Sequence, residues 1–515
     1  MASIAAPNSA KTGGMTFTGL WLSIAVALLM ALPILLPPVL PLADLGGHLG
    51  RYVIQLDAGR DPQLAQWYTF HWLLIPNLGV DLLVQVLGPL LGAETAVRTV
   101  VFATAFLQAF GLLAVSRVVH GRITPFAIFA LPFVYAHSLL YGFLNYTLAL
   151  GLLWCSLALW IAMSERSTAR RRWAVFALIA TVMWVCHLVG WALLCIAAGS
   201  QELVRQHERK GKFIPAAIAS IAPLSCLLVP WFVKLLTFQP STGAGRSTGF
   251  FRMADKLGEV FQVFRDQWYR FDTISVEIIV ILIVWSWFTA WTRLNRGLTL
   301  AAAITAVCVI LVPDRLLGSF FADQRLIEPA LLFALLAIGL SGRGPARLPQ
   351  VLFAAAILFA GARLAGNTVS LWQLGNRSAN ELKVLDALPR HAQMVTFRAI
   401  ACQPPVEWTF DRWTHLSGYA IARRHAFSND QWQVPGAQLL RVHNPAAGPF
   451  ASDDTQIVFE TPCGGKEGVM SRIDRVPADI PYLWVLWSRQ PNSLTGWEPL
   501  ARNGRSVLYR RPRAL

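Results

Sequence analysis

Three ionisable side chains lie within Pro41-Leu42-Ala43-Asp44-Leu45-Gly46-Gly47-His48-Leu49-Gly50-Arg51, a stretch that directly follows a long apolar segment. The apolar segment runs from about Phe17 to Val39 and is long enough to cross a bilayer, which takes about 20 residues. Asp44, His48 and Arg51 therefore emerge at a membrane surface. Their i, i+4, i+7 spacing puts them on one face if the stretch is helical. A carboxylate, an imidazole and a guanidinium at such a boundary suit work on a lipid-linked, charged substrate.

The composition of the whole chain is that of a polytopic α-helical membrane protein. Of its 515 residues, 55% are hydrophobic and 14% are charged, whereas soluble proteins carry about 25% charged residues. The mean hydropathy is +0.49. Residues 1–14 are mostly small and polar, and the apolar segment after them is too long for the core of a signal peptide. We therefore expect the first segment to be a membrane span.

The formal net charge of +16 does not indicate nucleic-acid binding. The basic residues lie mostly in short loops between apolar segments, as the topology determinants of membrane proteins do. Five clusters are evident, at residues 117–122, 166–172, 205–212, 293–296 and 343–347. If all five face the cytoplasm, the spans between them come in pairs. The basic excess also suits contact with anionic membrane lipids, which we expect as partners.

This pairing predicts about eleven spans, with the N-terminus in the cytoplasm and the C-terminus outside. The segments lie at about 17–39, 97–116, 123–138, 143–163, 213–236, 276–292, 297–313, 327–341 and 348–366, with two short spans inside 173–203. His187 lies at the turn between those two short spans. Residues 71–92 contain Pro76, Asn77 and Asp81 and cannot form a full span without inverting every later loop. We expect a surface or re-entrant helix there, inside a first outer loop of residues 40–96.

The composition changes near residue 370, where we divide the chain into a membrane domain, 1–369, and an extracytoplasmic soluble domain, 370–515. The second part is polar, with short apolar runs typical of strands at 394–397, 456–459 and 482–487, and a helical pattern at 381–388. It is long enough for one small α/β domain. Cys402 and Cys463 are its two cysteines. We expect a disulfide between them because an outer compartment is oxidising.

Several features accompany Asp44 along the chain. The first outer loop continues with a Pro-led amphipathic segment at 75–83 and a Leu-Gly-x-x-x-Ala-x-Arg stretch at 91–98, and His187 follows at the outer turn of two short spans. This arrangement, closed by a soluble outer domain, resembles the GT-C superfamily of membrane glycosyltransferases, which includes protein O-mannosyltransferases and the lipid A aminoarabinose transferase. The Asp44-x-x-x-His48-x-x-Arg51 string, with Gly-Phe-Leu-Asn-Tyr at 142–146, also looks like a set of uncharacterised bacterial membrane proteins.

The resemblance implies a catalytic role for Asp44, because the acidic residue of the first loop is the candidate base in the related enzymes. The alternative is a structural role as the N-cap of a helix that begins near Leu45. Near Asp44 the chain lacks the paired Asp-Asp or Asp-Glu of O-mannosyltransferases and the Asp-x-Asp of metal-using oligosaccharyltransferases. No cofactor is indicated by the sequence, and the need for a divalent metal and the class of acceptor both stay open.

Five further side chains are candidates for substrate binding: His48, Arg51, His187, Arg315 and Arg325. His48 suits a phosphate contact, the orientation of the nearby carboxylate or the coordination of a metal, and Arg51 suits bidentate phosphate binding. Contact with lipid headgroups is the alternative for both. Arg315 and Arg325 lie in a charged loop at the outer face, and we expect them to hold a lipid phosphate, with internal Asp–Arg pairs as the alternative. His187 either lines the cavity or serves as a structural residue.

The resemblance predicts a glycosyltransferase that takes a sugar from a polyprenyl-phosphate donor at the outer face and passes it to a glycan, lipid or protein. It places the chain in a bacterial inner membrane, with the N-terminus cytoplasmic and residues 370–515 periplasmic or extracellular. The alternatives are a transporter or flippase for lipid-linked sugars and a non-catalytic assembly factor with the same fold. Such transporters usually show internal repeats and charges at the membrane midplane, and neither is evident in the sequence. The oligomeric state stays open.

Overall fold

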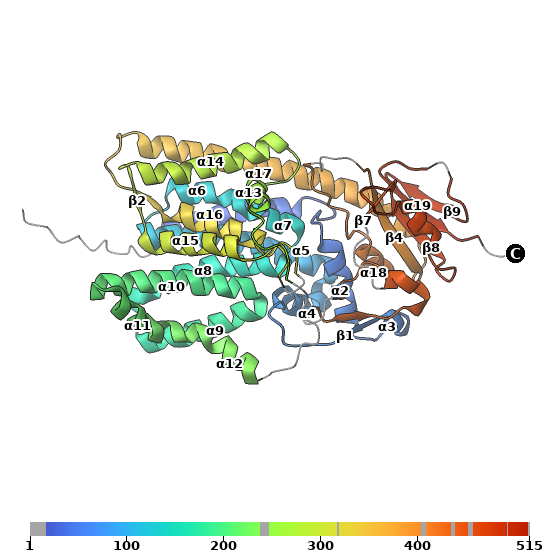
Figure 1. The fold of residues 1–515 in the computed structure, drawn as a ribbon, viewed down its shortest axis with the longest axis horizontal. Helices are drawn as coiled ribbons and strands as arrows, with labels where there is room; N and C mark the ends of the chain where they lie inside the picture. The colour runs from blue at the N-terminus through green and yellow to red at the C-terminus, as the bar shows by residue number, and fades with distance from the viewer. Residues whose placement is uncertain are drawn as a thin grey trace, which may run out of the picture.

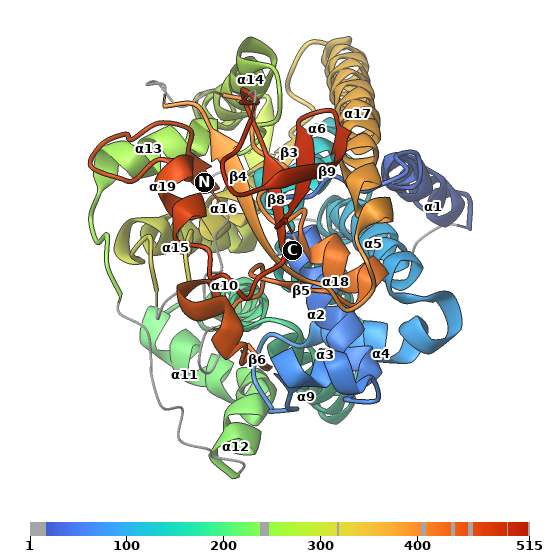
Figure 2. The same ribbon diagram turned by 90° about the vertical axis from the view of Figure 1, so that its right-hand side faces the viewer.

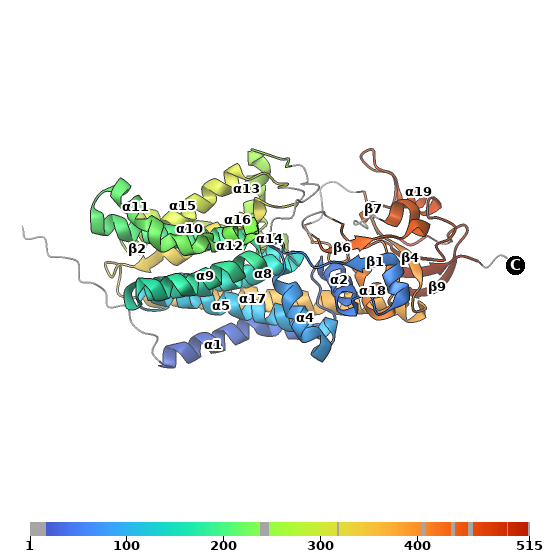
Figure 3. The same ribbon diagram turned by 90° about the horizontal axis from the view of Figure 1, so that it is seen from below.

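The computed structural model describes residues 17–236, 247–316, 319–402, 408–433, 438–451, 457–491 and 493–512. The molecule is elongated, with a bundle of long helices at one end and a smaller domain built on a β-sheet at the other (Figure 1). Helix α2, residues Leu45–Asp57, lies between these two parts (Figure 3). Residues 41–51, which carry Asp44, His48 and Arg51, therefore lie where the two parts of the molecule meet.

Apolar helices form the bundle. They are α1 (Phe17–Ala31), α5 (Ala93–His120), α6 (Pro125–Ala130), α7 (His137–Tyr141), α8 (Leu144–Arg166), α9 (Ala169–Cys186), α10 (Leu188–Lys210), α11 (Phe213–Leu224), α12 (Val229–Leu236), α14 (Tyr269–Phe288), α15 (Arg296–Leu311), α16 (Gln324–Ala337) and α17 (Leu348–Glu381). Six helical segments of the described chain are long and apolar enough to cross a membrane. The chain is thus a multi-pass membrane protein, while the count of eleven spans stays a prediction.

Local sequence sets where these helices begin and end. Gly121 and Gly211 end α5 and α10 in the left-handed conformation, with φ of 72° and 70°, which glycine adopts without steric penalty. Thr168 caps α9 by accepting a hydrogen bond from the N–H of Arg171 at 3.3 Å. His187 is extended and separates α9 from α10. The predicted turn between two helices at His187 is therefore confirmed.

The first outer loop contains three helices and one short strand: α2, α3 (Pro62–Trp67), β1 (Tyr68–Phe70) and α4 (Gly79–Leu91). Helix α4 leaves an apolar face exposed, including Leu82, Val86 and Leu90, as a helix lying on a membrane surface does. A helix is thus present within residues 71–92, as predicted, but it begins only at Gly79. Residues 71–78, around Pro76, are not helical.

The C-terminal domain is built on a six-stranded sheet with the order β5-β4-β8-β10-β9, and β7 also pairs with β4. Strand β4 runs parallel to β5, β7 and β8, whereas β10 is antiparallel to β8 and β9. Paired residues such as Val395 and Leu483 are fully buried and form its core. The elements are β4 (Gln393–Ile400), α18 (Gly418–Arg424), β5 (Phe427–Ser428), β6 (Leu440–Val442), β7 (Ile457–Phe459), α19 (Val469–Asp474), β8 (Tyr482–Leu486), β9 (Glu498–Asn503) and β10 (Ser506–Arg510).

Several expectations for this domain are confirmed. Strands β4, β7 and β8 coincide with the three apolar runs. Cys402 and Cys463 form a disulfide, with their Cα atoms 5.7 Å apart. The helical pattern at 381–388 is a 3₁₀ helix, Leu382–Ala387, that continues α17. Because α17 itself runs to Glu381, the predicted boundary at 369/370 falls inside a continuous helix.

The first outer loop packs into the C-terminal domain. Strand β1 pairs antiparallel with β6, with Tyr68 opposite Val442, and the Tyr68 hydroxyl donates to the carbonyl of Ser428 at 2.8 Å. Ile54 and Trp67 belong to the same buried apolar cluster as the strands of the sheet. Figure 2 shows α2, α3 and α18 grouped together beside the sheet. The loop and the domain therefore share one core.

Two shorter pieces complete the described structure. Helix α13 (Met253–Phe261) lies between α12 and α14 in the chain. Strands β2 (Thr292–Leu294) and β3 (Ile338–Leu340) pair antiparallel. Figure 1 shows β2 at the end of the bundle that is far from the C-terminal domain.

Candidate functional site

Asp44 occupies the N-cap position of α2, but its side chain makes no capping hydrogen bond. Its backbone N–H donates to the carbonyl of Tyr141 at 2.9 Å, and the N–H of Ala43 donates to Leu140 at 3.2 Å. Gly142 follows with φ 91°, and a Cβ there would lie 3.1 Å from the Asp44 nitrogen. The Gly-Phe-Leu-Asn-Tyr string thus lets the chain pass close to the Asp44 backbone. The capping alternative finds no support in these contacts.

Two side chains of the C-terminal domain face the Asp44 carboxylate. His415 Nε2 lies 4.0 Å from Asp44 Oδ1, and His415 Nδ1 lies 2.9 Å from Asp430 Oδ1. The Asp430 side chain is fully buried, and those of His415 and Asp44 are 5% and 22% exposed. An ionised Asp430 accepts a hydrogen bond from Nδ1–H and so turns Nε2 toward Asp44. Because 4.0 Å is too long for a hydrogen bond, Asp44 can still accept one from a ligand.

The electrostatic surroundings make Asp44 an unusual carboxyl group. Burial raises its pKa to about 6, and the positive charges of His415 and Arg325 oppose this rise. A carboxyl group with a pKa near 6 is ionised at neutral pH, yet it accepts a proton more readily than an ordinary aspartate does. The geometry and the pKa together suit a general base.

Arg325 brings a positive charge to the same site. Its guanidinium lies 4.3 Å over the Phe143 ring and donates to Ser319 Oγ at 2.9 Å. The Tyr146 hydroxyl donates to the Arg325 carbonyl. Among the residues that the structure describes, no carboxylate forms an ion pair with Arg325. A guanidinium in this state is suited to an anionic ligand such as a phosphate.

His48 lies on α2, one turn beyond Asp44, and shares an aromatic neighbour with His415. The Trp432 ring lies 5.0 Å from the His48 ring and 4.4 Å from the His415 ring. Burial, assisted by the charge of Arg51, lowers the pKa of His48 well below its usual value, so its imidazole is neutral. Its Nδ1 is buried and has no hydrogen-bond partner among the described residues. A polar atom in this state is a candidate contact for a ligand.

Arg51 does not join this group. Its guanidinium forms a buried ion pair with Asp81 at the start of α4. Asn145 donates to Asp81 Oδ2 at 3.3 Å and accepts a hydrogen bond from the N–H of Val80 at 2.6 Å. These contacts hold α2, α4 and α8 together. We therefore do not propose a phosphate-binding role for Arg51, because its guanidinium is buried and its charge is neutralised by Asp81.

His187 and Arg315 have different surroundings. His187 Nδ1 accepts a hydrogen bond from the N–H of Val189 at 3.2 Å, which caps α10, and its ring lies 5.4 Å from that of Tyr146. This contact favours the structural role for His187. The Arg315 guanidinium lies 3.7 Å over the Phe320 ring. Arg315 stays a candidate for phosphate binding, whereas we do not propose a substrate-binding role for His187.

The alternative role for Arg315 and Arg325 was pairing with an aspartate inside residues 314–325. The described part of this loop shows no such ion pair. Asp323 forms an ion pair with Lys256 of α13. Its second oxygen accepts a hydrogen bond from the N–H of Gln324 at 2.9 Å. The carboxylate that was expected to neutralise a neighbouring arginine is therefore engaged by a lysine from another helix.

A second buried arginine fixes the C-terminal domain against the stretch that carries Asp44. Arg412 donates to the carbonyl of Pro41 at 2.8 Å and to Asp266 Oδ1 at 2.7 Å. Close packing adds to this, because a Cβ at Gly46 would lie 1.9 Å from the carbonyl oxygen of His415. Only glycine allows this approach. These contacts set the position of His415 relative to α2.

Sequence reasoning missed the site residues of the C-terminal domain, His415, Asp430 and Trp432. They lie far from α2 in the chain, so no spacing rule connects them with it. The available signal was local composition, because the strings at 411–415 and 429–432 combine charged and aromatic side chains between strands. Such loops are common places for functional residues.

Two groups of described side chains are close enough to hold a metal ion, and Asp44 belongs to neither. The groups are Asp61 with His391 and His425, and Glu259 with Asp314 and Asp323. The site around Asp44 instead joins one carboxylate of raised pKa, a histidine oriented by a second carboxylate, and an arginine that forms no ion pair with a described carboxylate. This set can remove a proton and stabilise an anion.

Comparison with known proteins identifies the fold. No protein-family model and no curated protein matches the chain. The chain is similar to the solved structure of ArnT from Cupriavidus metallidurans bound to undecaprenyl phosphate, with 15% sequence identity and a TM-score of 0.51. The match covers 96% of this chain and 98% of that chain.

The apo state of the same ArnT gives a matching result, with 13% identity, a TM-score of 0.50, and coverage of 96% of this chain and 97% of that chain. At such low identity the likeness shows the fold. The chain has the fold of these ArnT structures, and the resemblance predicted from the sequence is thereby confirmed at the level of the fold.

Proposed function

We propose that the chain is a membrane glycosyltransferase that moves a sugar from a polyprenyl-phosphate donor to a glycan, lipid or protein acceptor. The fold supports the enzyme class, and the ArnT structure with undecaprenyl phosphate supports the class of donor. One observation carries the proposal. The Asp44 carboxylate caps no helix and lies 4.0 Å from a histidine that a buried aspartate orients.

Asp44 is the general base of the proposed reaction. It removes the proton from an acceptor hydroxyl while the hydroxyl oxygen attacks the anomeric carbon of the donor sugar. The bond between that carbon and the phosphate oxygen breaks, and the phosphate leaves with the bonding electrons. A carboxyl group with a pKa of about 6 is ionised at neutral pH and ready for this step. Such a base contributes roughly a hundredfold or more to the rate.

His415 is a positioning residue in this scheme. Asp430 holds its imidazole through the 2.9 Å contact with Nδ1, and its Nε2 faces the carboxylate that takes the proton. A positive charge on His415 lowers the pKa of Asp44, so this histidine helps to keep the base ionised. The C-terminal domain therefore contributes directly to the proposed site.

Arg325 is the group that binds the donor phosphate in this proposal, with Arg315 of the same loop as the second candidate. The charge of Arg325 acts on Asp44, which supports a phosphate position beside the base. His48 offers a neutral imidazole for a polar group of the substrate. An arginine that forms charge-assisted hydrogen bonds with phosphate also stabilises the negative charge that develops as the donor bond breaks.

We place the reaction on the outer face of a bacterial inner membrane. Basic residues flank β2 and α11, which lie at the end of the bundle far from the C-terminal domain (Figure 1). The positive-inside rule puts that end in the cytoplasm. Asp44 and residues 370–515 then face the periplasm or the cell exterior, and the N-terminus faces the cytoplasm.

The proposal is tested with purified protein, a panel of polyprenyl-phosphate sugars and a membrane extract as the source of acceptor. We expect wild type to release polyprenyl phosphate from at least one donor. Arg325→Ala should raise the KM for that donor about tenfold, because a hydrogen bond to a charged group contributes about 1.5–3 kcal/mol. Arg343→Ala, at an exposed arginine in another loop, is the matched control.

Two results would count against the proposal. One is the absence of release from every donor in the panel. The other is movement of intact donor across proteoliposome membranes without consumption, which would support a flippase instead.

A further inference from the structure

Three metal-ligand side chains converge at the junction between the first outer loop and the C-terminal domain. Asp61 Oδ2 lies 2.7 Å from His391 Nε2 and 2.7 Å from His425 Nδ1. Asp61 is the N-cap of α3, His391 precedes β4, and His425 follows α18. The side chains are 15%, 28% and 26% exposed, so solvent can reach them. The cluster is separate from the Asp44 site.

The surrounding backbone holds these groups in place. The second oxygen of Asp61 accepts hydrogen bonds from the N–H groups of Gln63 and Leu64 at 3.1 and 3.4 Å, which fixes the carboxylate. His391 and His425 both have left-handed backbones, with φ of 59° and 51°. This conformation is unfavourable for residues other than glycine, and it concentrates at functional positions. The two histidines therefore point at one fixed carboxylate oxygen, so the three side chains form a preformed set of ligands.

We infer that Asp61, His391 and His425 bind one divalent transition-metal ion of the Zn²⁺ class, with water completing the coordination. Imidazole nitrogen and carboxylate oxygen are ligands that zinc prefers. Tetrahedral zinc places neighbouring ligand atoms about 3.3 Å apart, so each 2.7 Å contact opens by about half an ångström when the ion enters. Each imidazole then presents a lone pair, and its proton moves to the other ring nitrogen.

A metal here fastens the first outer loop to the domain that supplies His415. Asp61 lies in the chain between α2 and α3, as the N-cap of α3, and His425 directly follows α18. The two helices are in close contact, because a Cβ at Gly418 would lie 2.0 Å from the carbonyl oxygen of Gly46. The ion is thus a structural clamp that stabilises the interface beside the Asp44 site and touches no substrate.

The test measures metal content and absorption spectra of the full chain, purified without a polyhistidine tag. Two variants keep a hydrogen-bond donor to Asp61 but remove the imidazole ligand. They are His391→Gln, whose amide replaces Nε2, and His425→Asn, whose amide replaces Nδ1 and which tolerates the left-handed backbone. His443→Gln, at an exposed histidine of the same domain, is the matched control.

We expect wild type and His443→Gln to bind one Co²⁺ per chain with the visible absorption bands of a tetrahedral site, and Zn²⁺ to displace it. Both ligand variants should lose these bands, and Zn²⁺ should no longer raise their unfolding temperature. Binding of Co²⁺ by His391→Gln and His425→Asn at the wild-type level would overturn the inference, as would a wild type without bands. Neither result bears on the proposed glycosyl transfer, which is measured separately.

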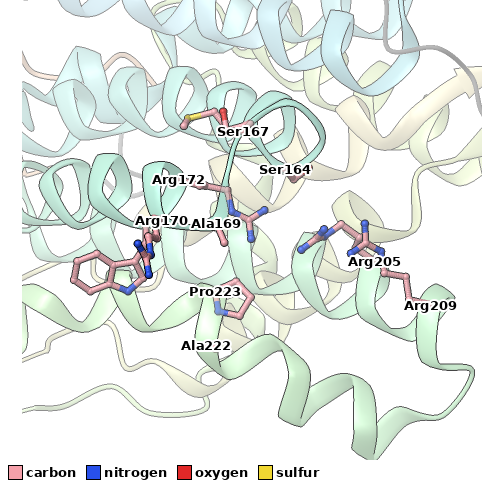
Figure 4. Close-up of a pocket in the computed structure, with 11 residues that line it drawn as sticks. Ser164, Ser167, Ala169, Arg170, Arg172, Arg205, Arg209, Ala222 and Pro223 are labelled. Carbon is pink, nitrogen blue, oxygen red and sulfur yellow. The ribbon is translucent and has the colours of Figure 1, made fainter.

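A different observation supports a second site, at the end of the bundle far from the C-terminal domain. A cavity of about 520 Å³ lies between the ends of α8, α9, α10 and α11, and four arginines line it (Figure 4). Arg172 and Arg205 share one buried carboxylate, Glu202, at 3.2 Å each. Arg170 and Arg209 are exposed and form no ion pair with a described carboxylate. The cavity therefore carries a clear excess of positive charge.

The other lining residues of this cavity are mostly apolar, with Ser164 and Ser167 as the polar exceptions. Met163, Trp173 and Pro223 line it, and Trp173, Phe213 and Ile214 nearby are exposed on the outside of the bundle. Exposed apolar side chains next to a basic cluster mark the boundary between hydrocarbon and headgroups. We propose that the cavity binds the phosphate of an anionic phospholipid, whose acyl chains lie against the apolar wall.

Native mass spectrometry of the full chain in detergent tests this proposal, with phosphatidylglycerol as the probe. Arg170→Ala with Arg209→Ala removes two charges from the cavity without touching the Glu202 pairs. Arg171→Ala with Lys210→Ala is the matched control, because these exposed neighbours lie outside the lining. We expect the first double variant to bind phosphatidylglycerol about a hundredfold more weakly, since two charged donors to the phosphate are removed, and the control to resemble wild type.

Three outcomes would overturn this second proposal. They are equal binding by both double variants, equal binding of phosphatidylcholine, and complete competition by glycerol phosphate. The last would show a site for a free phosphate.

Discussion

Two groups of charged side chains around α2 differ in how completely their charges are paired. In one group, Arg51 forms a buried ion pair with Asp81, and Asn145 adds a hydrogen bond. In the other, Asp44 stands 4.0 Å from His415 and makes no capping bond. A paired group stabilises the fold. A partly buried carboxylate that is not paired in this way can still accept a proton or a hydrogen bond from a substrate. Ionisable groups in such surroundings cluster at functional sites.

The second group also has a different effect on stability. The pKa of Asp44 in the folded chain is about 6, above the ordinary value of 3.8. The folded chain therefore binds this proton more tightly than the unfolded chain does. The resulting destabilisation is absent below about pH 3.8, grows between the two pKa values and is complete above about pH 6. Residues that lower the stability of the fold are typical of active sites, where activity is the reason for their presence.

The largest expected effect lies in the paired group. Arg51→Ala should lower the free energy of unfolding by about 3–5 kcal/mol, because it leaves the Asp81 carboxylate buried without a partner. Unfolding of detergent-purified protein measures this change. Replacing both partners, as Arg51→Met with Asp81→Leu, should recover most of the loss.

Arg325→Ala is the contrasting variant and should unfold close to wild type, since no described carboxylate forms an ion pair with Arg325. If Arg51→Ala unfolded like wild type but bound donor weakly, Arg51 would be a phosphate-binding residue and not a structural one.

His415→Asn should reduce turnover about tenfold or more with little change in unfolding. The asparagine amide replaces Nδ1 and preserves the hydrogen bond to Asp430, while the Nε2 that faces Asp44 is lost. The activity should also need a higher pH, because the positive charge of His415 lowers the pKa of Asp44. Measuring kcat against pH for the two proteins checks both expectations. If His415→Asn kept wild-type turnover and the same pH profile, His415 would have no role in the proposed reaction.

The pH dependence of wild type gives the smallest and most specific effect. Asp44 acts as a base only when ionised, so kcat/KM should be constant above about pH 6 and fall about tenfold per pH unit below it. In Arg325→Ala this acidic limb should move to higher pH, because the charge that lowers the pKa of Asp44 is gone. An acidic limb at the same pH in Arg325→Ala and wild type would show that the charge of Arg325 does not act on Asp44.

Much of the fold could be predicted from local patterns. Apolar length located the bundle helices, the turn at His187 followed from a run too long for one span, and short apolar runs in a polar region located three strands. The disulfide between Cys402 and Cys463 followed from their being the two cysteines of one polar domain. These features depend on residues that are near one another in the chain or of a rare type.

The site could be predicted only in part. Asp44 and Arg325 stood out because charges next to apolar spans are unusual. The pairing of Arg51 with Asp81 joins two helices of the first loop, and no helical spacing reveals it. His415 reaches Asp44 through the packing of two domains, which a single sequence does not encode in any short pattern.

The most direct measurement compares wild type with Asp44→Asn in the same preparations, for both transfer from a polyprenyl-phosphate sugar and unfolding near pH 7.5. If Asp44 is the base, turnover falls roughly a hundredfold or more, while the unfolding temperature stays unchanged or rises, because a buried charge is removed. Asp44→Ala should lose turnover equally. Wild-type turnover by Asp44→Asn would contradict the account, and so would a turnover loss explained by a lower unfolding temperature.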